Sequence, residues 1–237
     1  MISESKRGRE IHALAEKARE GEQNFLKSLN LLNEATIAYL EDKDYLGASE
    51  AQGSRFIALK HLYERTKEDA YLTLATLAAQ AAVEIAEEHK INQALPLAYF
   101  NLGKAYEEEE NYKKALTPFR KAFKKSLKDL PERHNRPALK ADIKAHLAFI
   151  EYMCGNKSAI TKLEEAIKEL ESSDEGKYTK DVWLSGAHMR TAKALRKNNP
   201  KKAKEHLEKA RQIIESNPNL TLRKGQLEEI ENKLKLS

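Results

Sequence analysis

The stretch that decides the fold is residues 96–129, PLAYFNLGKAYEEEENYKKALTPFRKAFKKSLKD. Its second half places Ala115, Phe119 and Ala122 at steps of four and three, which return to one face of an α-helix. A small, large, small pattern lets a neighbouring helix backbone approach closely while the large side chain fills the space between. The stretch therefore predicts helices packed on one another, and no long segment of the chain shows the period-two alternation of a strand.

The same triplet recurs twice further along the chain at a constant interval. The interval is 44 residues, since 159 − 115 and 203 − 159 are both 44. A fixed period in this range is typical of stacked helical repeats. The later triplets are Ala159/Leu163/Ala166 and Ala203/Leu207/Ala210.

Composition agrees with a helical protein. Of the 237 residues, 33% are charged, 41% are hydrophobic and 7% are aromatic, and there are only nine glycines and six prolines. This is too hydrophobic for a disordered chain and poorly suited to an all-β fold. The net charge of +5 permits an anionic partner, although mixed charge of this size more often keeps a protein soluble. The single cysteine, Cys154, excludes an internal disulfide and favours a reducing compartment.

Breaks between the periodic stretches predict a series of helices joined by short links. Short links require neighbouring helices to run antiparallel. We expect Gly21 to divide the first helix in two. The predicted helices span 5–41, 44–65, 67–89, 93–109, 111–129, 136–154, 156–172, 178–197, 200–216 and 219–235.

Residues 96–129 resemble one unit of the tetratricopeptide repeat (TPR) family. The match has that family's length of 34 residues and its residue types in order, although Leu127 replaces the usual proline near the end. Segments 156–172 and 200–216 match only the second helix of the unit. The matching positions are Tyr99, Leu102, Gly103, Tyr106, Tyr112, Ala115, Phe119 and Ala122.

The resemblance implies an all-α, right-handed α-solenoid of antiparallel helical hairpins, TPR-like. The period of 44 residues exceeds the family's usual unit and implies longer helices. We expect one continuous solenoid with irregular N-terminal hairpins in 1–92, TPR-like repeats in 93–218 and a C-terminal capping helix in 219–237. The capping helix should turn Leu222, Leu227, Ile230 and Leu234 inward.

The N-terminal third allows two pairings of its helices. Tyr39, Tyr45 and Ala48 copy the spacing of Tyr106, Tyr112 and Ala115, which would make 44–65 the second helix of a hairpin. Alternatively, first and second helices alternate along the chain. Because 93–109 is a first helix, 67–89 is then a second helix and 44–65 is a first helix. We favour alternation, because burial on both sides of each helix depends on it; an irregular N-terminal hairpin is the alternative.

The predicted function is a non-catalytic scaffold that binds a peptide or protein segment in a concave groove. Such grooves are lined by the first helix of each hairpin. By the resemblance, Asn101 occupies the position at which the family's asparagines hold a ligand backbone, and an amide can both donate and accept hydrogen bonds. Leu97, Phe100, Lys104 and Glu108 should line the same groove.

The alternative function is a nucleic-acid-associated module that uses a basic face of helix 111–129. Cations on such a face could meet phosphates, but aromatic residues do not interleave with them as single-strand binders prefer. The basic face comprises Arg120, Lys121, Lys124, Lys125 and Lys128.

Signals for catalysis are nearly absent. The seven histidines include no HExxH motif and no pair at metal-ligand spacing, so we expect no enzyme activity, metal or cofactor. Asp142 and His146 share a helical face, and we interpret them as a surface pair. We interpret Cys154 as a small core residue.

The sequence also bears on location and assembly. No segment has the apolar core of a signal peptide or the length of a membrane span, so we expect a cytoplasmic protein. Self-association through the alanine-rich helix 67–89 stays open, although internal packing is the more common role of such a stripe. The stripe comprises Ala75, Ala78, Ala79, Ala82 and Ala86.

Overall fold

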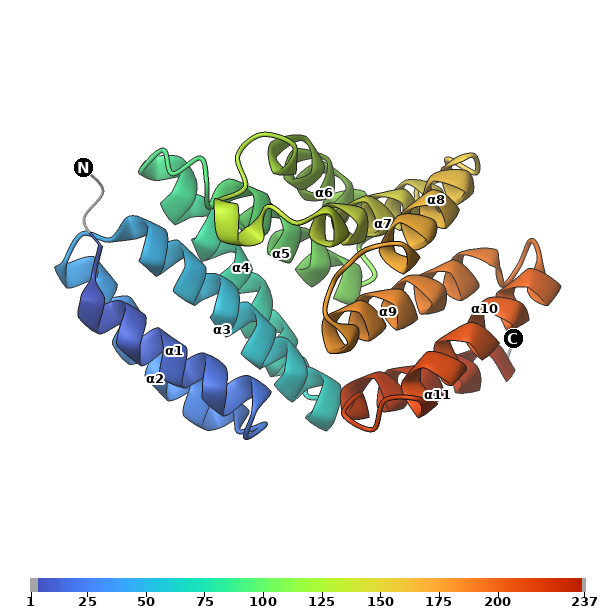
Figure 1. Cartoon of the computed structure of the whole chain (residues 1–237), viewed down its shortest axis with the longest axis horizontal. Coiled ribbons are helices and arrows are strands. Elements are labelled where there is room, and N and C mark those ends of the chain that lie inside the picture. Colours follow the sequence, from blue (N-terminus) through green and yellow to red (C-terminus); the bar gives the residue numbers. More distant parts are fainter. Residues whose placement is uncertain (1–3, 236–237) are drawn as a thin grey trace. The chain divides into compact units, whose positions relative to one another are not determined.

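The structure, a computed structural model, describes residues 4–235, with side chains up to Asn232. Within these residues it contains eleven α-helices, one short 3-10 helix and no strand (Figure 1). Gly21 ends the first helix, as predicted. The helices are α1 (Lys6–Glu20), α2 (Phe25–Glu41), α3 (Tyr45–Thr66), α4 (Asp69–Glu88), α5 (Leu95–Glu108), α6 (Tyr112–Ser126), η1 (Glu132–His134), α7 (Pro137–Met153), α8 (Ala159–Glu171), α9 (Lys177–Leu195), α10 (Pro200–Glu215) and α11 (Thr221–Lys235).

The chain divides into two compact units. The N-terminal unit is Met1–Glu132 and the C-terminal unit is Arg133–Ser237. The division falls within 93–218, the range in which the sequence predicts continuous TPR-like repeats.

The N-terminal unit consists of three antiparallel hairpins, α1/α2, α3/α4 and α5/α6. The two helices of each hairpin make the most extensive contacts in the unit (Figure 1). The first helices also contact one another, α1 with α3 and α3 with α5, while α2 packs on α3 and α4 on α5. Each helix is therefore covered by neighbours on at least one side, which lets short amphipathic segments bury their apolar faces.

This pairing confirms the alternation of helices in the N-terminal third, since α3 is the first helix of a hairpin with α4. The spacing of Tyr39 and Tyr45, which matches that of Tyr106 and Tyr112, does not reflect the same place in a hairpin. It reflects a turn that both segments share. Lys43 and Glu110 both adopt a left-handed backbone, at φ 57° and 54°. The next residues, Asp44 and Asn111, cap α3 and α6 by accepting hydrogen bonds from backbone amides. The same turn joins two hairpins in one case and two helices of one hairpin in the other.

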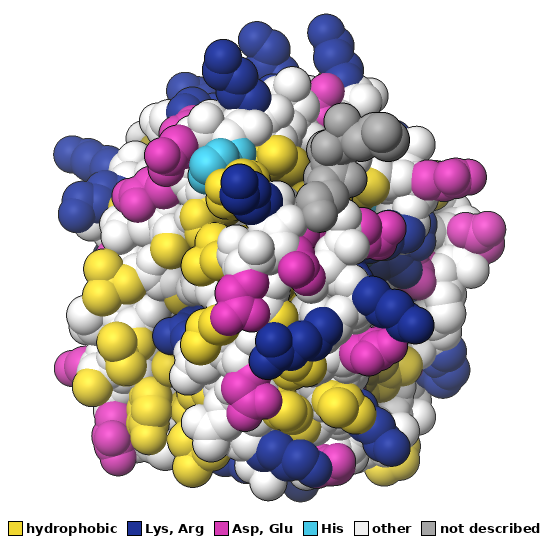
Figure 2. All heavy atoms as spheres, turned by 90° about the vertical axis from the view of Figure 1, so that its left-hand side faces the viewer, with side chains coloured by type: hydrophobic (Ala, Val, Ile, Leu, Met, Phe, Trp, Pro, Cys, Tyr) yellow, Lys and Arg dark blue, Asp and Glu magenta, His cyan; other side chains and the backbone are white. Residues whose placement is uncertain are grey.

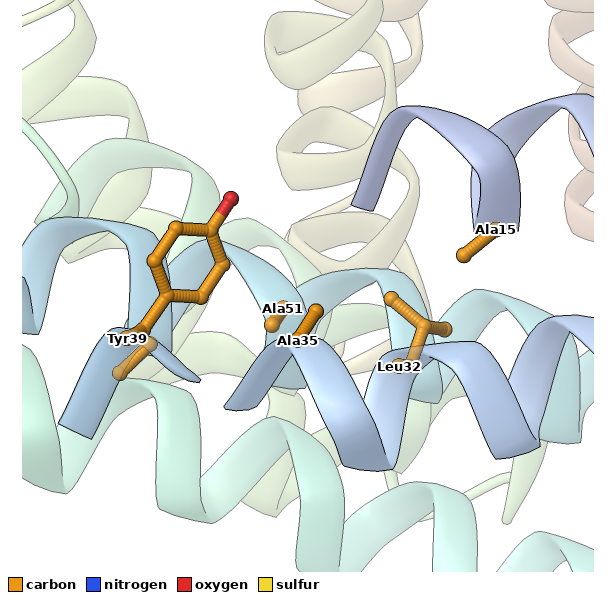
Figure 3. Close-up of a cluster of buried hydrophobic side chains, with 6 residues drawn as sticks. Ala15, Leu32, Ala35, Tyr39 and Ala51 are labelled. Carbon is orange, nitrogen blue, oxygen red and sulfur yellow. The ribbon is translucent and has the colours of Figure 1, made fainter. Parts of the chain in front are cut away.

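A tyrosine ring fills the space between α1, α2 and α3. Tyr39 is fully buried and belongs to a cluster that contains alanines of all three helices, in which Ala15 lies near Leu32 (Figure 3). A Cβ atom on Gly8 or Gly47 would lie 2.4 Å or 2.3 Å from the Tyr39 ring. Glycine is therefore required at both positions, because any side chain there would displace the ring. The cluster comprises Ala15, Leu32, Ala35, Tyr39, Ala48 and Ala51.

The alanine stripe of α4 is also internal. Its five alanines are at most 5% exposed, so this stripe packs within the unit. Ala75, Ala78 and Ala79 form a second buried cluster with Phe56, Leu59 and Ala105 of the neighbouring first helices.

The C-terminal unit contains the hairpins α7/α8 and α9/α10, followed by α11, which packs on α9 and α10. The three alanine-centred triplets lie on the second helices α6, α8 and α10, and all nine of their residues are buried, as predicted. Leu227 of α11 is also buried, whereas the predicted inward residue Leu234 lies outside the described side chains. Within residues 4–235, no helix is long and apolar enough to cross a bilayer.

Candidate binding face

The face that α3 and α5 share contains most of the residues predicted to line a groove. We call it the α3–α5 face and define it by Gly53, Phe56 and Lys60 of α3 and Leu97, Asn101, Lys104 and Glu108 of α5. Successive turns of the two helices meet here, because 53, 56 and 60 have the same spacing as 101, 104 and 108.

Asn101 lies opposite Gly53. Its amide nitrogen would be 3.0 Å from a Cβ atom built on Gly53, so the missing side chain makes room for the amide. Asn101 is 9% exposed. It takes part in no hydrogen bond with another residue of 4–235. A nearly buried amide without a partner keeps its donors and its acceptor available, and leaving them unpaired is unfavourable.

One turn further along α5, a lysine lies over two aromatic rings. Lys104 Nζ is 4.7 Å from the ring centroid of Phe100 and 5.5 Å from that of Phe56. Such cation–π contacts hold a lysine against the protein surface. The ammonium group is thereby positioned one turn from the Asn101 amide.

The far end of the face is acidic and ion-paired. Lys60 Nζ of α3 lies 3.0 Å from Glu108 Oε1 of α5 and also pairs with Glu64. Glu107 precedes this pair and Glu109 and Glu110 follow it. The face therefore changes from apolar at Leu97, through a free amide, to a lysine and then to carboxylates.

Polar contacts continue between α1 and α3. Arg9 Nη1 pairs with Glu50 Oε2 at 2.6 Å, and His12 Nε2 lies 2.9 Å from Ser54 Oγ. Burial raises the pKa of Glu16, but hydrogen bonding with His12 and the charge of Arg19 outweigh burial and lower this pKa to about 2. Each of these side chains makes at least one polar contact, although Arg9 Nε, Glu16 Oε1 and Arg19 Nη1 have no hydrogen-bond partner. Asn101 differs from them in that its whole side-chain amide lacks a partner among the described residues.

The predicted groove residues take different positions. Leu97, Lys104 and Glu108 are half-buried. Phe100 is 4% exposed, and its ring packs edge-on against Phe119 of α6 with centroids 5.9 Å apart, so it supports its own hairpin. Sequence reasoning missed Gly53, Phe56 and Lys60, although it favoured 44–65 as a first helix, because the register of α3 against α5 is visible only in the structure.

The basic face of α6 is partly occupied by contacts within the unit. Lys121 Nζ donates to Tyr99 Oη at 3.1 Å, and this hydrogen bond raises the pKa of Lys121. Lys125 Nζ donates to Asn92 Oδ1 at 3.0 Å and pairs with Asp129. Lys124 and Lys128 are exposed and have no partner among the described residues, and Arg120 is also exposed.

Two expectations for the C-terminal unit were wrong. Asp142 and His146 are buried at 4% and 7% exposure instead of lying on the surface. Asp142 accepts from Arg190 of α9 at 3.4 Å, which a single helix could not reveal. Cys154 is exposed instead of buried, because it follows α7 at the turn where Gly155 adopts a φ of 106°. Among the described residues, no group of three metal-ligating side chains comes together.

Comparison with known proteins gives information on the fold. No protein-family model matches the sequence, and no curated protein matches it. A solved structure from Podosopora anserina, described as a kinesin light chain with nearly identical TPR-like repeats, is 17% identical. It matches with a TM-score of 0.57 over 90% of this chain and 98% of that one. A point variant of the same protein gives the same identity and TM-score over 88% and 94%.

A third structure extends the similarity. BtubC (BKLC) from P. vanneervenii is 19% identical and matches with a TM-score of 0.62 over 88% of this chain and 80% of that one. Identities at this level define the fold alone. The chain therefore has an all-α, TPR-like solenoid fold built from antiparallel helical hairpins, which confirms the fold class predicted from the sequence.

Proposed function

We propose that the chain is a non-catalytic scaffold that binds an extended peptide or a protein segment on the α3–α5 face. The observation that carries the proposal is the Asn101 amide, nearly buried and without a hydrogen-bond partner among the described residues. Solenoids of helical hairpins present first-helix surfaces of this kind to their ligands.

The chemistry of the face indicates how such a ligand would bind. An extended backbone offers an N–H and a C=O at each residue, and one carboxamide can accept from the first and donate to the second. Lys104 would add a cation beside that contact, and the acidic end near Glu108 would favour a basic residue further along the ligand.

The test uses peptides selected from a random library of about 12 residues on the immobilised chain, with affinities then measured by fluorescence anisotropy. We expect Asn101→Ala combined with Lys104→Ala to weaken binding about 10-fold or more, since two to three hydrogen bonds are lost. The double variant should lose about 1 kcal/mol of stability or less from the cation–π contacts of Lys104, because Asn101 has no internal hydrogen bond to lose.

The matched control is Lys113→Ala combined with Thr117→Ala. It removes one lysine and one polar side chain from exposed positions of α6. The control should bind like the wild type. Equal affinity of the Asn101/Lys104 variant and the wild type for the selected peptides would exclude the α3–α5 face.

A nucleic-acid role for the α6 basic face is the second candidate, and the exposed, unpaired Lys124 and Lys128 favour it. Five phosphate contacts would give a slope of about −4.5 for log affinity against log salt, at about 0.9 per contact. We expect a slope no steeper than about −2 on a polyanion, because two lysines of the face lack partners. A slope near −4.5, lost on Lys124→Glu and Lys128→Glu, would favour this candidate over peptide binding.

A further inference from the structure

The N-terminal unit exposes large hydrophobic side chains on two of its second helices. Of the eight that are exposed within the described residues, five lie on α2 and α4, with exposed fractions of 47–58%. Figure 2 looks onto the N-terminal helices and shows hydrophobic side chains gathered on one side of the view. Concentration of this kind is typical of interaction surfaces. The five are Leu26, Ile37, Leu40, Leu74 and Leu77.

These side chains form stripes with the spacing of helix-packing positions. On α2, exposed residues follow one another at steps of four, three, four and three, and on α4 a similar stripe has the same steps. Steps of this kind present one seam to a facing helix. The α2 stripe is Leu26, Asn30, Asn33, Ile37 and Leu40, and the α4 stripe is Ala70, Leu74, Leu77, Ala81 and Glu84.

Helices α2 and α4 both pack on α3. Leu29 of α2 packs against the buried cluster that includes alanines of α4, and Ile85 of α4 packs against the cluster that includes Leu32 and Tyr39. Together they make one face, which we call the α2–α4 face and define by the two stripes.

The centres of the two stripes lie at the same level of the unit. Contacts of Phe25 with His61 and of Tyr39 with Gly47 place Asn33 level with residue 53 of α3. The hydrogen bond from Ser49 to the Ala82 carbonyl then places residue 53 level with residue 78 of α4, next to Leu77.

We propose that the α2–α4 face binds the same face of a second copy of this chain, related by a two-fold axis at the level of Asn33 and Leu77. With antiparallel helices, the two-fold places each stripe position opposite the stripe position that lies equally far beyond the axis in the second copy, to within one residue. Antiparallel α2 helices would then place Leu26 opposite Leu40 of the second copy, Asn30 opposite Ile37, and Asn33 opposite itself. On α4, Leu74 meets Ala81 and Leu77 meets itself.

Charges bordering the α2 stripe also complement one another. Antiparallel pairing about Asn33 brings Lys27 of one copy within one helical turn of Glu41 of the other. Within one copy Lys27 pairs with Glu22 and Glu41 pairs with Arg7. These exposed pairs are weak enough to exchange for a contact across the axis. A central asparagine in an apolar seam fixes register. One contact is unfavourable, because Glu34 lies next to the axis and approaches Glu34 of the second copy.

The dimensions of the face suit a weak dimer. Helices of 17 and 20 residues are about 25 Å and about 30 Å long at about 1.5 Å per residue. Each helix presents a strip about 10 Å wide, the width of a helix with its side chains, so the two strips together amount to about 550 Å². Specific interfaces begin near about 600 Å² per partner, so we expect a dissociation constant on the order of 10 µM.

Sedimentation equilibrium of the full chain between about 1 µM and about 200 µM tests the proposal. The mass should rise from 27.0 kDa toward twice that value. Ile37→Asp places a charge in the seam and should raise the dissociation constant at least about 30-fold. Leu127→Asp is the matched control, since Leu127 is equally exposed but lies at the end of α6, and it should associate like the wild type.

A second variant, expected to strengthen association, distinguishes an effect on the interface from a loss of folding. Glu34→Gln removes the repulsion at the axis and should lower the dissociation constant about threefold or more. A monomer at every concentration would overturn the proposal and leave the face to a different partner. A dimer unaffected by Ile37→Asp would place the interface elsewhere and overturn it equally.

The register is tested by a disulfide across the axis. In a Cys154→Ser background, Asn33→Cys should form a covalent dimer on mild oxidation. The reason is that the Cα atom of residue 33 in one copy lies close to the same atom of the second copy across the two-fold. Thr117→Cys, exposed on α6, should not. Failure of Asn33→Cys to cross-link in a dimer would refute the proposed two-fold.

Discussion

The buried histidine pair of the C-terminal unit makes that unit sensitive to acid. His188 of α9 and His206 of α10 are 2% and 7% exposed, and their Nδ1 atoms are 2.9 Å apart. One Nδ1 atom must donate a hydrogen bond and the other must accept it. In the neutral pair, one ring therefore carries its proton on Nδ1 and the other on Nε2. Burial lowers the pKa of His188 from 6.5 to about 3, and positive charge on His206, when it is protonated, and on Lys209 contributes to the shift. Burial also lowers the pKa of His206.

The sign and size of the effect follow from these pKa values. Below pH 6.5 the unfolded chain takes up a proton on His188, whereas the folded unit does so only near pH 3. The free energy of unfolding therefore falls as the pH falls through this window. From pH 7.5 to pH 5, His188 alone accounts for about 2 kcal/mol, at about 1.4 kcal/mol per unit below its unfolded pKa. His206 adds to the loss in the same direction.

The single tryptophan provides the assay. Trp183 lies in α9 of the same unit, so its fluorescence during urea denaturation follows the unfolding of this unit. We expect the urea midpoint to fall between pH 7.5 and pH 5, corresponding to a loss of about 2 kcal/mol or more.

A double variant separates the histidines from other titrating groups. His188→Leu combined with His206→Leu replaces both hydrogen-bond partners, so that neither is left unpaired. Its loss of stability over the same pH range should be smaller by about 2 kcal/mol. An equal loss in the double variant and the wild type would refute the assignment of acid sensitivity to this pair.

Further predictions concern the helix contacts. Ala122→Arg and Ala166→Arg each drive a cation into a fully buried contact and should abolish cooperative thermal unfolding in circular dichroism; melting like the wild type in both would refute the buried face of α6 and α8. Gly103→Ala should cost about 1–3 kcal/mol in urea titrations, because its Cβ would lie 2.8 Å from the Phe119 ring. Gly225→Ala, with open space around it, is the matched control and should be neutral or stabilising by about 0.5–1 kcal/mol.

The helices and their hairpins were predictable because their signals are local. Small residues at steps of four and three identify a packed face, and asparagine or aspartate caps identify where helices begin. The turns at Lys43 and Glu110 show the limit of this reasoning. Their similar sequences specify one local geometry, and the role of the following helix depends on which neighbour it packs against.

The environments of polar side chains were less predictable because they depend on distant segments. Asp142 and His146 are polar residues that share one face of their own helix, and Asp142 is buried against Arg190 of α9, which the sequence of one helix does not reveal. The sequence identified Asn101 through a resemblance, but its partner across the face, Gly53, is 48 residues earlier in the chain, since 101 − 53 is 48. The histidine pair likewise joins two helices.

The most direct test of the central claim is hydrogen–deuterium exchange of the full chain with and without a selected peptide. Binding on the α3–α5 face predicts slower exchange in segments 50–62 and 95–110 and unchanged exchange in α6 and α8. Protection confined to α6, or no change within α3 and α5, would contradict the account.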